Sequence, residues 1–563
     1  MSPEGELTTA RSTTEPPAGR LPSSLGLLRQ AIDLNDDPRA FWFGLAVVVL
    51  IQAFSALGYV QRGQVNFTSD QAVPALMALE IRDHGSHPVF YWGVQYDGSL
   101  EPHLLSLAFR VLPETVESYR IVIFGLMASA TVLVSLATAL GFGRRAGLLA
   151  GAYLAAGPSF LFFKLLGSDG AYGSFFTLTA ATVYLVARIV DQTEDDRSSF
   201  LHFALGVVLG VAWWVTPLSI VLPGVVAAGV FVTHRTWLKP IRIVLLSTGF
   251  ALGASPWLLE NVRTDFASLR SAEMRGSDLQ QARSQARVLL ARGLPVLLGG
   301  RSPGGREATF PGSEAISVIL FGGLVMAGAR LARRNAPTTA RFLALSSTFL
   351  LVAPAVMALS RARTDLREDP RFLLSSYVAV AVLSGVALAT LIERRARLGA
   401  LAFAGIFLFL GPLSQLRSQS YAEDPRHGRI AETIALAERL AASGIRDVYA
   451  EYWIAYRLAF LSGGEVVASP FGEGTPGPIR DIRAYERVEA AASPAFILEP
   501  DPAKRLLAFL DARAASYSHE RLPDLGRELI WGIPSGEMAM LRACHCFPAP
   551  DATSPVAGTG TPQ

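Results

Sequence analysis

The sequence predicts an α-helical polytopic membrane protein that ends in a small α/β domain. Hydrophobic residues make up 51% of the 563 residues, and the mean hydropathy is +0.35, which exceeds that of most soluble globular proteins. Uncharged runs of a length that suits a bilayer recur between residues 41 and 416. Beyond residue 416, charged residues become regular and apolar residues come in short clusters.

A polar segment, residues 1–40, precedes the first apolar run. It is rich in Pro, Ser and Thr, and it lacks the cationic start, apolar stretch and small-residue cleavage site of a secretory signal. We therefore expect a flexible cytoplasmic N-terminus and a first span that stays in the membrane.

The membrane domain is predicted over residues 41–416, with about eleven transmembrane helices. Lipid offers the backbone no hydrogen-bond partners, so each crossing needs about twenty apolar helical residues. The run 203–233 is too long for one crossing, and Pro217 near its middle would interrupt a helix, so we divide it into two short spans. The uncharged runs are 41–60, 121–140, 146–163, 170–187, 203–233, 243–259, 315–329, 342–360, 372–392 and 398–416.

Basic residues in the short loops predict the orientation, because Arg and Lys collect on the cytoplasmic side of a membrane. With the N-terminus inside, four groups of loop cations share that side, and an odd number of crossings leaves residues 61–118 and the chain after 416 outside. The groups are Arg144 and Arg145; Arg235, Lys239 and Arg242; Arg330, Arg333 and Arg334; and Arg394, Arg395 and Arg397.

The first outer loop, residues 61–118, is predicted to contain two helices that lie along the membrane surface. Apolar residues follow helical spacing in "QAVPALMALEI" and in "LEPHLLSLAFRVL". The expected apolar faces are Ala72, Ala75, Leu76 and Leu79 in the first helix and Leu100, Leu104, Leu107 and Val111 in the second.

Polar residues stand at the start of the first of these helices. Ser69 or Asp70 would accept hydrogen bonds from free backbone N–H groups there, and an Asp in that position is more often a cap than a catalyst. Between the two helices, "HPVFYWGVQYDGSLE" combines aromatic rings, glycines and two acids four residues apart. We expect this stretch to bind substrate, with an interfacial aromatic belt as the alternative for the rings. The expected residues are Tyr91, Trp92, Tyr96, Asp97 and Glu101.

Residues 417–549 are predicted to form a small extracytoplasmic α/β domain, followed by a disordered tail over 550–563. Clusters such as "IRDVYAEYWIAYRLAFLSGGEVVAS" and "PAFILEPDPAKRLLAFLDARAA" indicate strands that alternate with helices. Tyr452, Trp453 and Tyr456 would either present aromatic faces to a sugar over the outer cavity or form a buried helix face.

The order of one span, then "SDQAVPALMALEIRDHGSHPVFYWGVQYDGSLEPHLLSLAFRV", then a run of short spans resembles the GT-C glycosyltransferases. It is similar in particular to the dolichyl-phosphate-mannose protein mannosyltransferases and the lipid A aminoarabinose transferases. The stretch "RFLLSSYVAVAVLSGVA" at 371–387 is similar to the entry of a late span in that family, with Phe372 in place of Tyr and no proline following.

This resemblance implies that Asp70 is the principal catalytic carboxylate and that Asp169 in "LLGSDGAYGSFF" is a second outer acid. Many family members have Glu directly after the catalytic Asp, whereas this chain has Gln71. Asp97 or Glu101 would have to supply any second carboxylate of that motif.

The expected chemistry places acids and cations at the outer ends of the spans. A carboxylate beside hydrocarbon loses hydration, which raises its pKa and makes it a better proton acceptor, and we assign the general base to Asp70. Arginine grips two phosphate oxygens, so the predicted donor-phosphate ligands are Arg371, Lys164, Arg361 and Arg363. Their alternative is contact with lipid headgroups or, for Lys164, pairing with Asp169.

No metal site is predicted, although a divalent cation stays open as a cofactor. His84, His87 and His103 share the first outer loop with Asp70, but their spacing fits no established ligand pattern.

The predicted function is transfer of a sugar from a polyprenyl-phosphate donor to an extracytoplasmic acceptor, which is a protein, a lipid or a cell-envelope glycan. The expected location is a bacterial inner membrane, with membrane lipids as further partners. A transporter or flippase of polyprenyl-linked glycans is the alternative, and a membrane anchor for a binding domain is a third reading. Nucleic acid is not an expected partner, because the net charge is only +3 and no block of like charge occurs.

Overall fold

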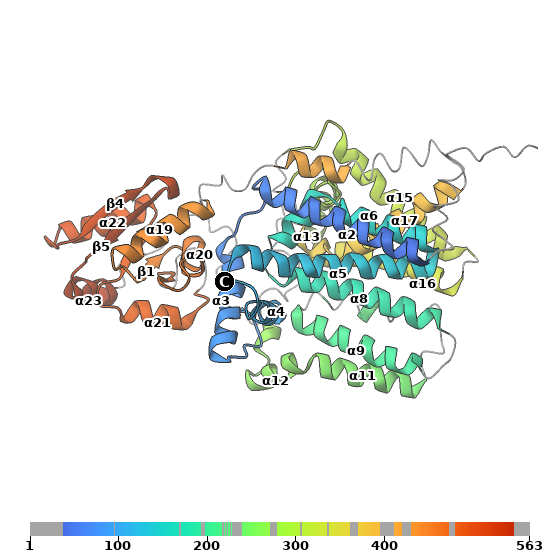
Figure 1. Cartoon of the computed structure of the whole chain (residues 1–563), viewed down its shortest axis with the longest axis horizontal. Helices are drawn as coiled ribbons and strands as arrows, with labels where there is room; N and C mark the ends of the chain where they lie inside the picture. Colours follow the sequence, from blue (N-terminus) through green and yellow to red (C-terminus); the bar gives the residue numbers. More distant parts are fainter. Residues whose placement is uncertain are drawn as a thin grey trace, which may run out of the picture.

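The structure, a computed structural model, is a bundle of long helices with a small α/β domain at one end (Figure 1). It describes residues 38–94, 96–167, 170–192, 197–216, 219, 221, 223–225, 227, 239–270, 279–303, 307–334, 337–360, 370–393, 410–418, 429–471 and 479–544. The main helices of the bundle are α2 (Pro38–Gln61), α5 (Val116–Phe142), α6 (Arg144–Ala155), α7 (Ser159–Leu166), α8 (Tyr172–Asp191), α9 (Arg197–Val215), α11 (Pro240–Gly253), α12 (Ser255–Arg263), α15 (Ser313–Arg333), α16 (Thr338–Ser360) and α17 (Ser376–Glu393).

These are the helices of an integral membrane protein. Among the described residues, five helices are long and apolar enough to cross a membrane, and the number rises to seven if each of two bent helix pairs is one span. The five are α2, α5, α8, α15 and α17; α9 and α16 contain shorter apolar stretches. Much of the predicted run 398–416 and the second half of 203–233 lie outside the described residues, so the count of eleven stays a prediction.

Two predicted spans are bent rather than straight. The run 146–163 is divided into α6 and α7, which meet at 71°, and the run 243–259 into α11 and α12, which meet at 60°. Pro158 directly precedes α7, and Pro256 is the second residue of α12. Proline lacks the N–H that would continue the preceding helix, which explains both breaks.

Helices α9 and α11 pack closely through glycines four residues apart. A Cβ on Gly206 would lie 2.1 Å from the carbonyl oxygen of Leu246, and one on Gly249 would lie 2.2 Å from that of Phe203. Only glycine allows two helix backbones to approach this closely. The contacts advance in step along both helices, so α9 and α11 run in the same direction, which agrees with the predicted division of the chain between them at Pro217.

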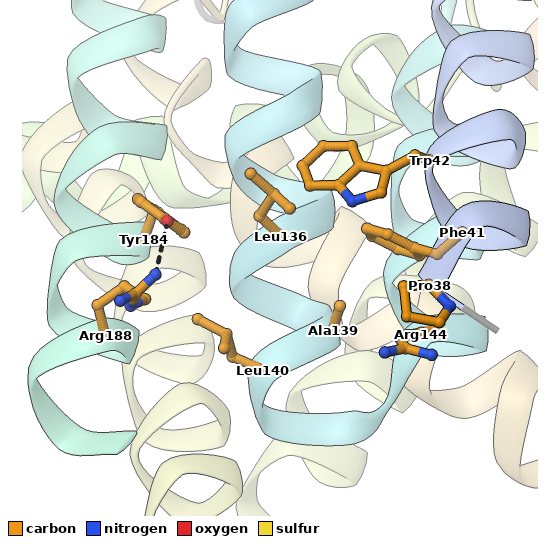
Figure 2. Close-up of a pocket in the computed structure, with 9 residues that line it drawn as sticks. All are labelled: Pro38, Phe41, Trp42, Leu136, Ala139, Leu140, Arg144, Tyr184 and Arg188. Atoms are coloured by element: carbon orange, nitrogen blue, oxygen red, sulfur yellow. Dashed lines mark hydrogen bonds between the residues drawn. The ribbon is translucent and has the colours of Figure 1, made fainter. Parts of the chain in front are cut away.

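The two ends of the bundle differ in charge. Helices α3 (Ser69–His84) and α4 (Leu100–Ala108) lie at one end, which we call the α3 end (Figure 1). Basic residues of three of the predicted cytoplasmic loops lie at the opposite end: Arg144 and Arg145 begin α6, Lys239 and Arg242 flank the start of α11, and Arg330 and Arg333 end α15. Figure 2 shows a groove at this opposite end, between α2, α5 and α8.

The first outer loop contains the two predicted helices, α3 and α4, and their position along a membrane surface stays a prediction. Gln71 accepts a hydrogen bond from the Thr68 backbone at 3.1 Å, which makes Thr68 the residue that caps α3. The expectation that Ser69 or Asp70 is the cap is therefore wrong. Leu107 on α4 and Val111, just beyond its end, are both exposed.

The C-terminal residues form a five-stranded sheet in the order β2-β1-β3-β5-β4. Strand β1 is parallel to β2 and β3, whereas β5 is antiparallel to β3 and β4. Alternate residues of β1 point to opposite faces: Val448 packs with α19 and α20, and Tyr449 packs with α21 and α22. The elements are α19 (Ile430–Ala442), β1 (Asp447–Ala450), α20 (Tyr452–Leu461), β2 (Val467–Ser469), α21 (Ile482–Ala490), β3 (Ala495–Leu498), α22 (Pro500–Asp511), β4 (Ser518–Leu522), β5 (Arg527–Trp531) and α23 (Ser535–Cys544).

Helix α20 joins this domain to the bundle. Ile454 and Leu458 face the domain's own sheet, whereas Tyr452, Tyr456 and Phe460, at i, i+4 and i+8, are part of the main core of the bundle. The Phe460 ring lies 5.3 Å from that of Phe67, just before α3. The α/β domain is therefore docked through a buried aromatic stripe onto the α3 end.

Candidate active site

Asp70 lies in the first turn of α3, at the boundary between the bundle and the α/β domain. Its carboxylate is half-buried and accepts a hydrogen bond from the hydroxyl of Tyr452, the first residue of α20. The preceding residue contributes to the same junction, because the Ser69 hydroxyl accepts a hydrogen bond of 3.3 Å from the Arg457 backbone N–H. Since Thr68 caps the helix, the Asp70 side chain is available for this contact between domains.

Arg480 brings a positive charge to the same place. Its backbone N–H donates to the Tyr456 hydroxyl at 2.5 Å, and its guanidinium lies 3.5 Å from the carbonyl oxygen of Trp92. Burial lowers the pKa of this guanidinium, but Tyr452 and the Asp70 carboxylate beside it more than offset that effect, so the pKa lies above its ordinary value. Burial and the Asp70 charge raise the pKa of Tyr452, so its hydroxyl keeps the proton that it donates.

The turn at Trp92 and Gly93 fits against the segment that carries Arg480. Gly93 has φ +67°, and a Cβ there would lie 3.0 Å from the Ile479 carbonyl oxygen, so glycine is required both by the backbone conformation and by the space. Arg483 stacks over the Trp92 ring at 5.8 Å from its centroid.

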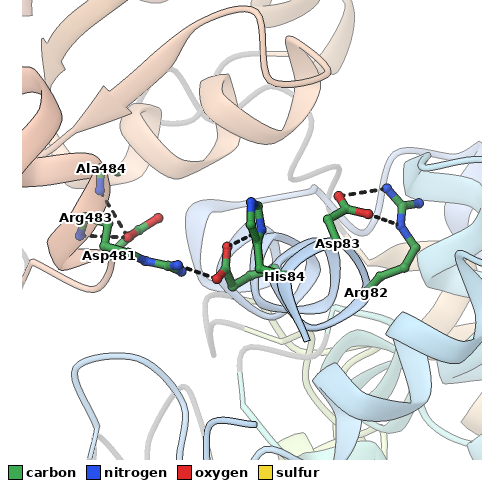
Figure 3. A network of polar contacts seen from close by, with 7 residues as sticks. Arg82, Asp83, His84, Asp481, Arg483 and Ala484 are labelled. Atoms are coloured by element: carbon green, nitrogen blue, oxygen red, sulfur yellow. Dashed lines mark hydrogen bonds and ion pairs between the residues drawn. The ribbon is translucent and has the colours of Figure 1, made fainter. Parts of the chain in front are cut away.

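An ion pair across the domain boundary lies nearby on α3. Arg483 of the α/β domain pairs with Glu80, and His84 contacts the same carboxylate at 3.0 Å. Figure 3 shows Arg483 reaching from the α/β domain toward α3, with Asp481 accepting hydrogen bonds from the backbones of Arg483 and Ala484 at 3.1 Å each. This network lies further along α3 than Asp70 and holds the α/β domain against the helix.

Gln71 connects the start of α3 to the connection between α7 and α8. Its amide nitrogen donates to the Gly167 carbonyl at 2.5 Å, while its amide oxygen accepts from Thr68. Lys164, three residues before Gly167, is buried, with its ammonium 5.8 Å from the centroid of the Tyr172 ring. Asp70 and Lys164 therefore belong to adjoining segments at the α3 end.

Tyr91 and Glu101 form an internal connection beneath the loop. Glu101 is fully buried. Its carboxylate accepts two hydrogen bonds, one of 2.8 Å from the backbone N–H of Ser174 at the start of α8 and one of 3.4 Å from the Tyr91 hydroxyl. Burial and Glu101 raise the pKa of Tyr91, which keeps that hydroxyl protonated. The backbone carbonyl of Asp97 accepts a hydrogen bond of 2.9 Å from the backbone N–H of Tyr91. These contacts shape the loop that presents Trp92 and Tyr96, and a direct substrate role for Tyr91, Asp97 or Glu101 stays a prediction.

Arg371 also lies toward the α3 end. It begins a short 3₁₀ turn, Arg371–Leu373, just before α17. Tyr377 in the first turn of α17 is an electrostatic neighbour of Tyr59 and Tyr153, which lie near the ends of α2 and α6 that point toward α3. Asp169, Arg361 and Arg363 lie outside the described residues.

The predicted histidines do not gather around Asp70. The rings of His87 and His103 are stacked with centroids 6.3 Å apart. Over the part of the chain that the structure describes, no group of three or more His, Cys, Asp or Glu side chains is arranged to hold a metal ion.

The site thus combines one carboxylate, one guanidinium and a set of aromatic faces. Of the two alternatives for the aromatic residues of "YAEYWIAYR", the buried helix face is the one that the structure bears out for Tyr452 and Tyr456, which lie in the core of the bundle. Arg480 and Arg483 were missed, because Arg480 lies in an irregular segment and Arg483 in the first turn of α21, and neither belongs to a recognisable motif. Chemically, an oriented carboxylate accepts a proton, a guanidinium binds an anion, and aromatic faces suit a sugar.

Comparison with solved structures identifies the fold. The crystal structure of ArnT from Cupriavidus metallidurans bound to undecaprenyl phosphate superposes with a TM-score of 0.58 at 15% identity, covering 87% of this chain and 97% of that one. The archaeal oligosaccharyltransferase AglB from Archaeoglobus fulgidus, in complex with an inhibitory peptide and a dolichol-phosphate, gives 0.51 at 13% identity, covering 88% and 74%. Both are members of the GT-C superfamily, and the chain has the GT-C fold.

In comparisons of sequence, no family model and no curated protein matches the chain.

Proposed function

We propose that this protein is a membrane glycosyltransferase that moves a sugar from a polyprenyl-phosphate donor to an extracytoplasmic acceptor. Two of the structures it is similar to were solved with undecaprenyl phosphate and with a dolichol-phosphate, which supports a lipid-phosphate donor. The acceptor is a protein, a lipid or a cell-envelope glycan.

The observation that carries the proposal is the position of Asp70. It stands at the end of the bundle where α3 and α4 lie, and its carboxylate faces the α/β domain. A donor that is half lipid and half sugar needs its reactive carbon at such a boundary between apolar helices and water.

In the proposed step, Asp70 accepts the proton of the acceptor hydroxyl or amine. The acceptor atom forms a bond to the anomeric carbon as the bond from that carbon to the phosphate oxygen breaks, and polyprenyl phosphate leaves with the electron pair. A positioned base contributes roughly 10²- to 10⁴-fold to such a transfer.

Cations at the α3 end would stabilise the departing phosphate. Arg371 and Lys164 remain the proposed ligands from the bundle, together with Arg361 and Arg363. We add Arg480, because its guanidinium lies beside Tyr452 and Asp70. Arginine suits this task through its planar fork of N–H donors.

The remaining assignments belong to the same proposal. Asp169 is the second outer acid, and Trp92 and Tyr96 contact the sugar. A divalent cation stays open as a cofactor.

The proposed arrangement in the membrane follows from the charges of the two ends. The domain over 41–416, with about eleven spans, lies in a bacterial inner membrane with the N-terminus in the cytoplasm, and the domain over 417–549 lies outside. The separation of basic loop residues from Asp70 supports this orientation.

Mass analysis of surface glycans and glycolipids, with and without the chain, tests the proposal and identifies sugar and acceptor together. Cells should lose one glycosylated product when the chain is deleted, and the wild-type chain should restore it. Asp70→Asn should fail to restore it while reaching the membrane at normal levels. Asp83→Asn is the matched control, since Asp83 lies on the same helix and pairs with Arg82 at 2.6 Å.

Restoration by Asp70→Asn would remove Asp70 from the chemistry. Movement of a polyprenyl-linked glycan across the membrane without formation of any product would identify a flippase instead.

A further inference from the structure

The groove at the end of the bundle opposite to α3 combines apolar walls with basic side chains. It has a volume of about 330 Å³ and lies where α2 begins and where α5 and α8 end (Figure 2). Its apolar walls include Phe41, Leu136 and Leu140, and Trp42 at its edge is 56% exposed. Arg144 lies on one side of the end of α5 and Arg188 on the other (Figure 2).

The polar groups of this groove suit an anion. Arg188 donates to the Tyr184 hydroxyl at 3.3 Å, which holds its guanidinium at the groove. Arg144 is the first residue of α6, whose N-terminus adds partial positive charge and has no side-chain cap among the described residues. None of the nine lining residues is acidic.

A ligand of this groove has to be amphiphilic. The arginines mark the polar end of the groove, and Trp42 and Leu136 lie further along the helices, toward the middle of the bundle (Figure 2). Basic pockets between transmembrane helices on the cytoplasmic side are suited to anionic lipid headgroups. A volume of about 330 Å³ accommodates a headgroup, while the acyl chains would extend along the outside of α2 and α5.

We propose that this groove is a binding site for an anionic glycerophospholipid of the leaflet opposite to Asp70. The headgroup phosphate is held by Arg144 and Arg188, and the first acyl carbons lie against Trp42 and Leu136. Any arginine at a span end contacts headgroups in passing. A specific binding site differs because it prefers anionic over zwitterionic headgroups and retains its lipid after extraction into detergent. This inference does not depend on the glycosyltransferase proposal.

Native mass spectrometry of the full chain in mild detergent tests the site, with phosphatidylglycerol and phosphatidylcholine of identical acyl chains as probes. The wild-type chain should retain phosphatidylglycerol in preference to phosphatidylcholine. Each arginine near the surface of an anionic membrane contributes about 1 kcal/mol, so Arg144→Gln and Arg188→Gln should each weaken retention about fivefold. Arg330→Gln with Arg333→Gln is the matched control, because these arginines are exposed at the same end on α15.

Trp42→Ala distinguishes the contribution of the apolar wall to lipid binding from that of the arginine charges. It should weaken retention of both lipids without changing their ratio, and size-exclusion profiles should show all variants folded. Equal retention of the two lipids by the wild-type chain would overturn the proposal. So would a loss in the α15 control as large as in the groove variants. Removal of residues 1–37 should leave retention unchanged; an increase would mean that this segment, and not a lipid, occupies the groove.

Discussion

The hydroxyl of Tyr452 donates a hydrogen bond to the carboxylate of Asp70 across 382 residues of sequence. The contact joins the first residue of α20 in the α/β domain to the first turn of α3 in the bundle. The group proposed as the general base is thus oriented by a domain that lies outside the helix bundle. Docking of that domain should therefore affect the chemistry as well as the stability of the protein.

Replacement of Tyr452 by Phe should slow transfer about tenfold, because a hydrogen bond to a charged group contributes on the order of 1.5–3 kcal/mol. Loss of a donor to the ionised carboxylate also raises the pKa of Asp70, so the acidic limb of the pH–rate profile should move to higher pH. A purely structural role would lower the rate without moving that limb.

The control for this variant is Tyr517→Phe. Tyr517 donates to Asp511 at 2.7 Å in the same domain, at an exposed position. A wild-type rate and pH profile for Tyr452→Phe would mean that the contact is incidental to catalysis.

Arg480→Gln should weaken binding of the lipid product, undecaprenyl phosphate, more than Arg480→Lys does. Lysine keeps the charge but loses the planar fork that grips two phosphate oxygens. Native mass spectrometry of retained undecaprenyl phosphate measures the effect. Arg487→Gln is the control, because Arg487 lies on α21 and pairs with Asp447 away from Asp70. Unchanged retention in both Arg480 variants would exclude Arg480 as a phosphate ligand.

Reversal of the ion pair between Glu80 and Arg483 tests the docking of the α/β domain. Glu80→Arg or Arg483→Glu alone places like charges together and should increase hydrogen exchange in α20. The two changes combined should restore protection, because the pair is then present in the opposite order. Partly exposed pairs contribute about 0.2–1 kcal/mol, so the expected change in exchange is up to about fivefold. If the double variant exchanges as fast as either single one, the pair does not hold the domain.

The course of the helices was predictable, because hydropathy and the placement of arginines are local properties of the sequence. The bends before Pro158 and Pro256 were missed, although both prolines stand in the uncharged runs. The helix in the first outer loop was predicted, but its cap was assigned to Ser69 or Asp70 instead of Thr68, one residue earlier. Boundaries are sensitive to single residues in a way that helical periodicity is not.

The site was predictable only in part. Their spacing placed Tyr452 and Tyr456 on one helix face. No local feature of the sequence predicts that this face contacts α3, because the contact depends on how the two domains dock. Arg480 has no periodic or motif context at all. From the sequence, Gln71 is a departure from the pattern of the resembling family. In the structure, its amide oxygen and its amide nitrogen each form a hydrogen bond.

Gln71→Glu should therefore destabilise the protein, even though many members of the resembling family have Glu there. A carboxylate still accepts from Thr68 but does not donate to the Gly167 carbonyl, and an unsatisfied partly buried group costs about 1–3 kcal/mol. The new negative charge beside Asp70 should also raise the pKa of that carboxyl. A thermal melt in detergent together with the pH–rate profile checks both effects. If neither changes, the amide bridge between α3 and the α7–α8 connection has no energetic role.

Glu451 should make stability depend on pH. It precedes Tyr452 and is buried, with its carboxylate 3.0 Å from the Arg527 guanidinium. Burial raises the pKa of Glu451 to about 7, although Arg527 favours the ionised form. Between the ordinary pKa of 4.5 and about 7, the folded state therefore binds more protons than the unfolded state. The stabilisation from this proton is fully present below the unfolded-state pKa and is lost as the pH rises through 7.

Glu451→Gln removes the titrating proton while its amide oxygen still accepts from Arg527. Thermal melts of the full chain in detergent at pH 5 and pH 7.5 should show the wild-type protein losing stability with rising pH, by up to about 3 kcal/mol. The variant should lose distinctly less over the same interval. Glu520→Gln is the control, since Glu520 forms an exposed pair with Arg439 at 2.6 Å. A slope in Glu451→Gln equal to that of the wild type would assign the pH dependence to other groups, and Glu451 would then be ionised throughout in its pair with Arg527.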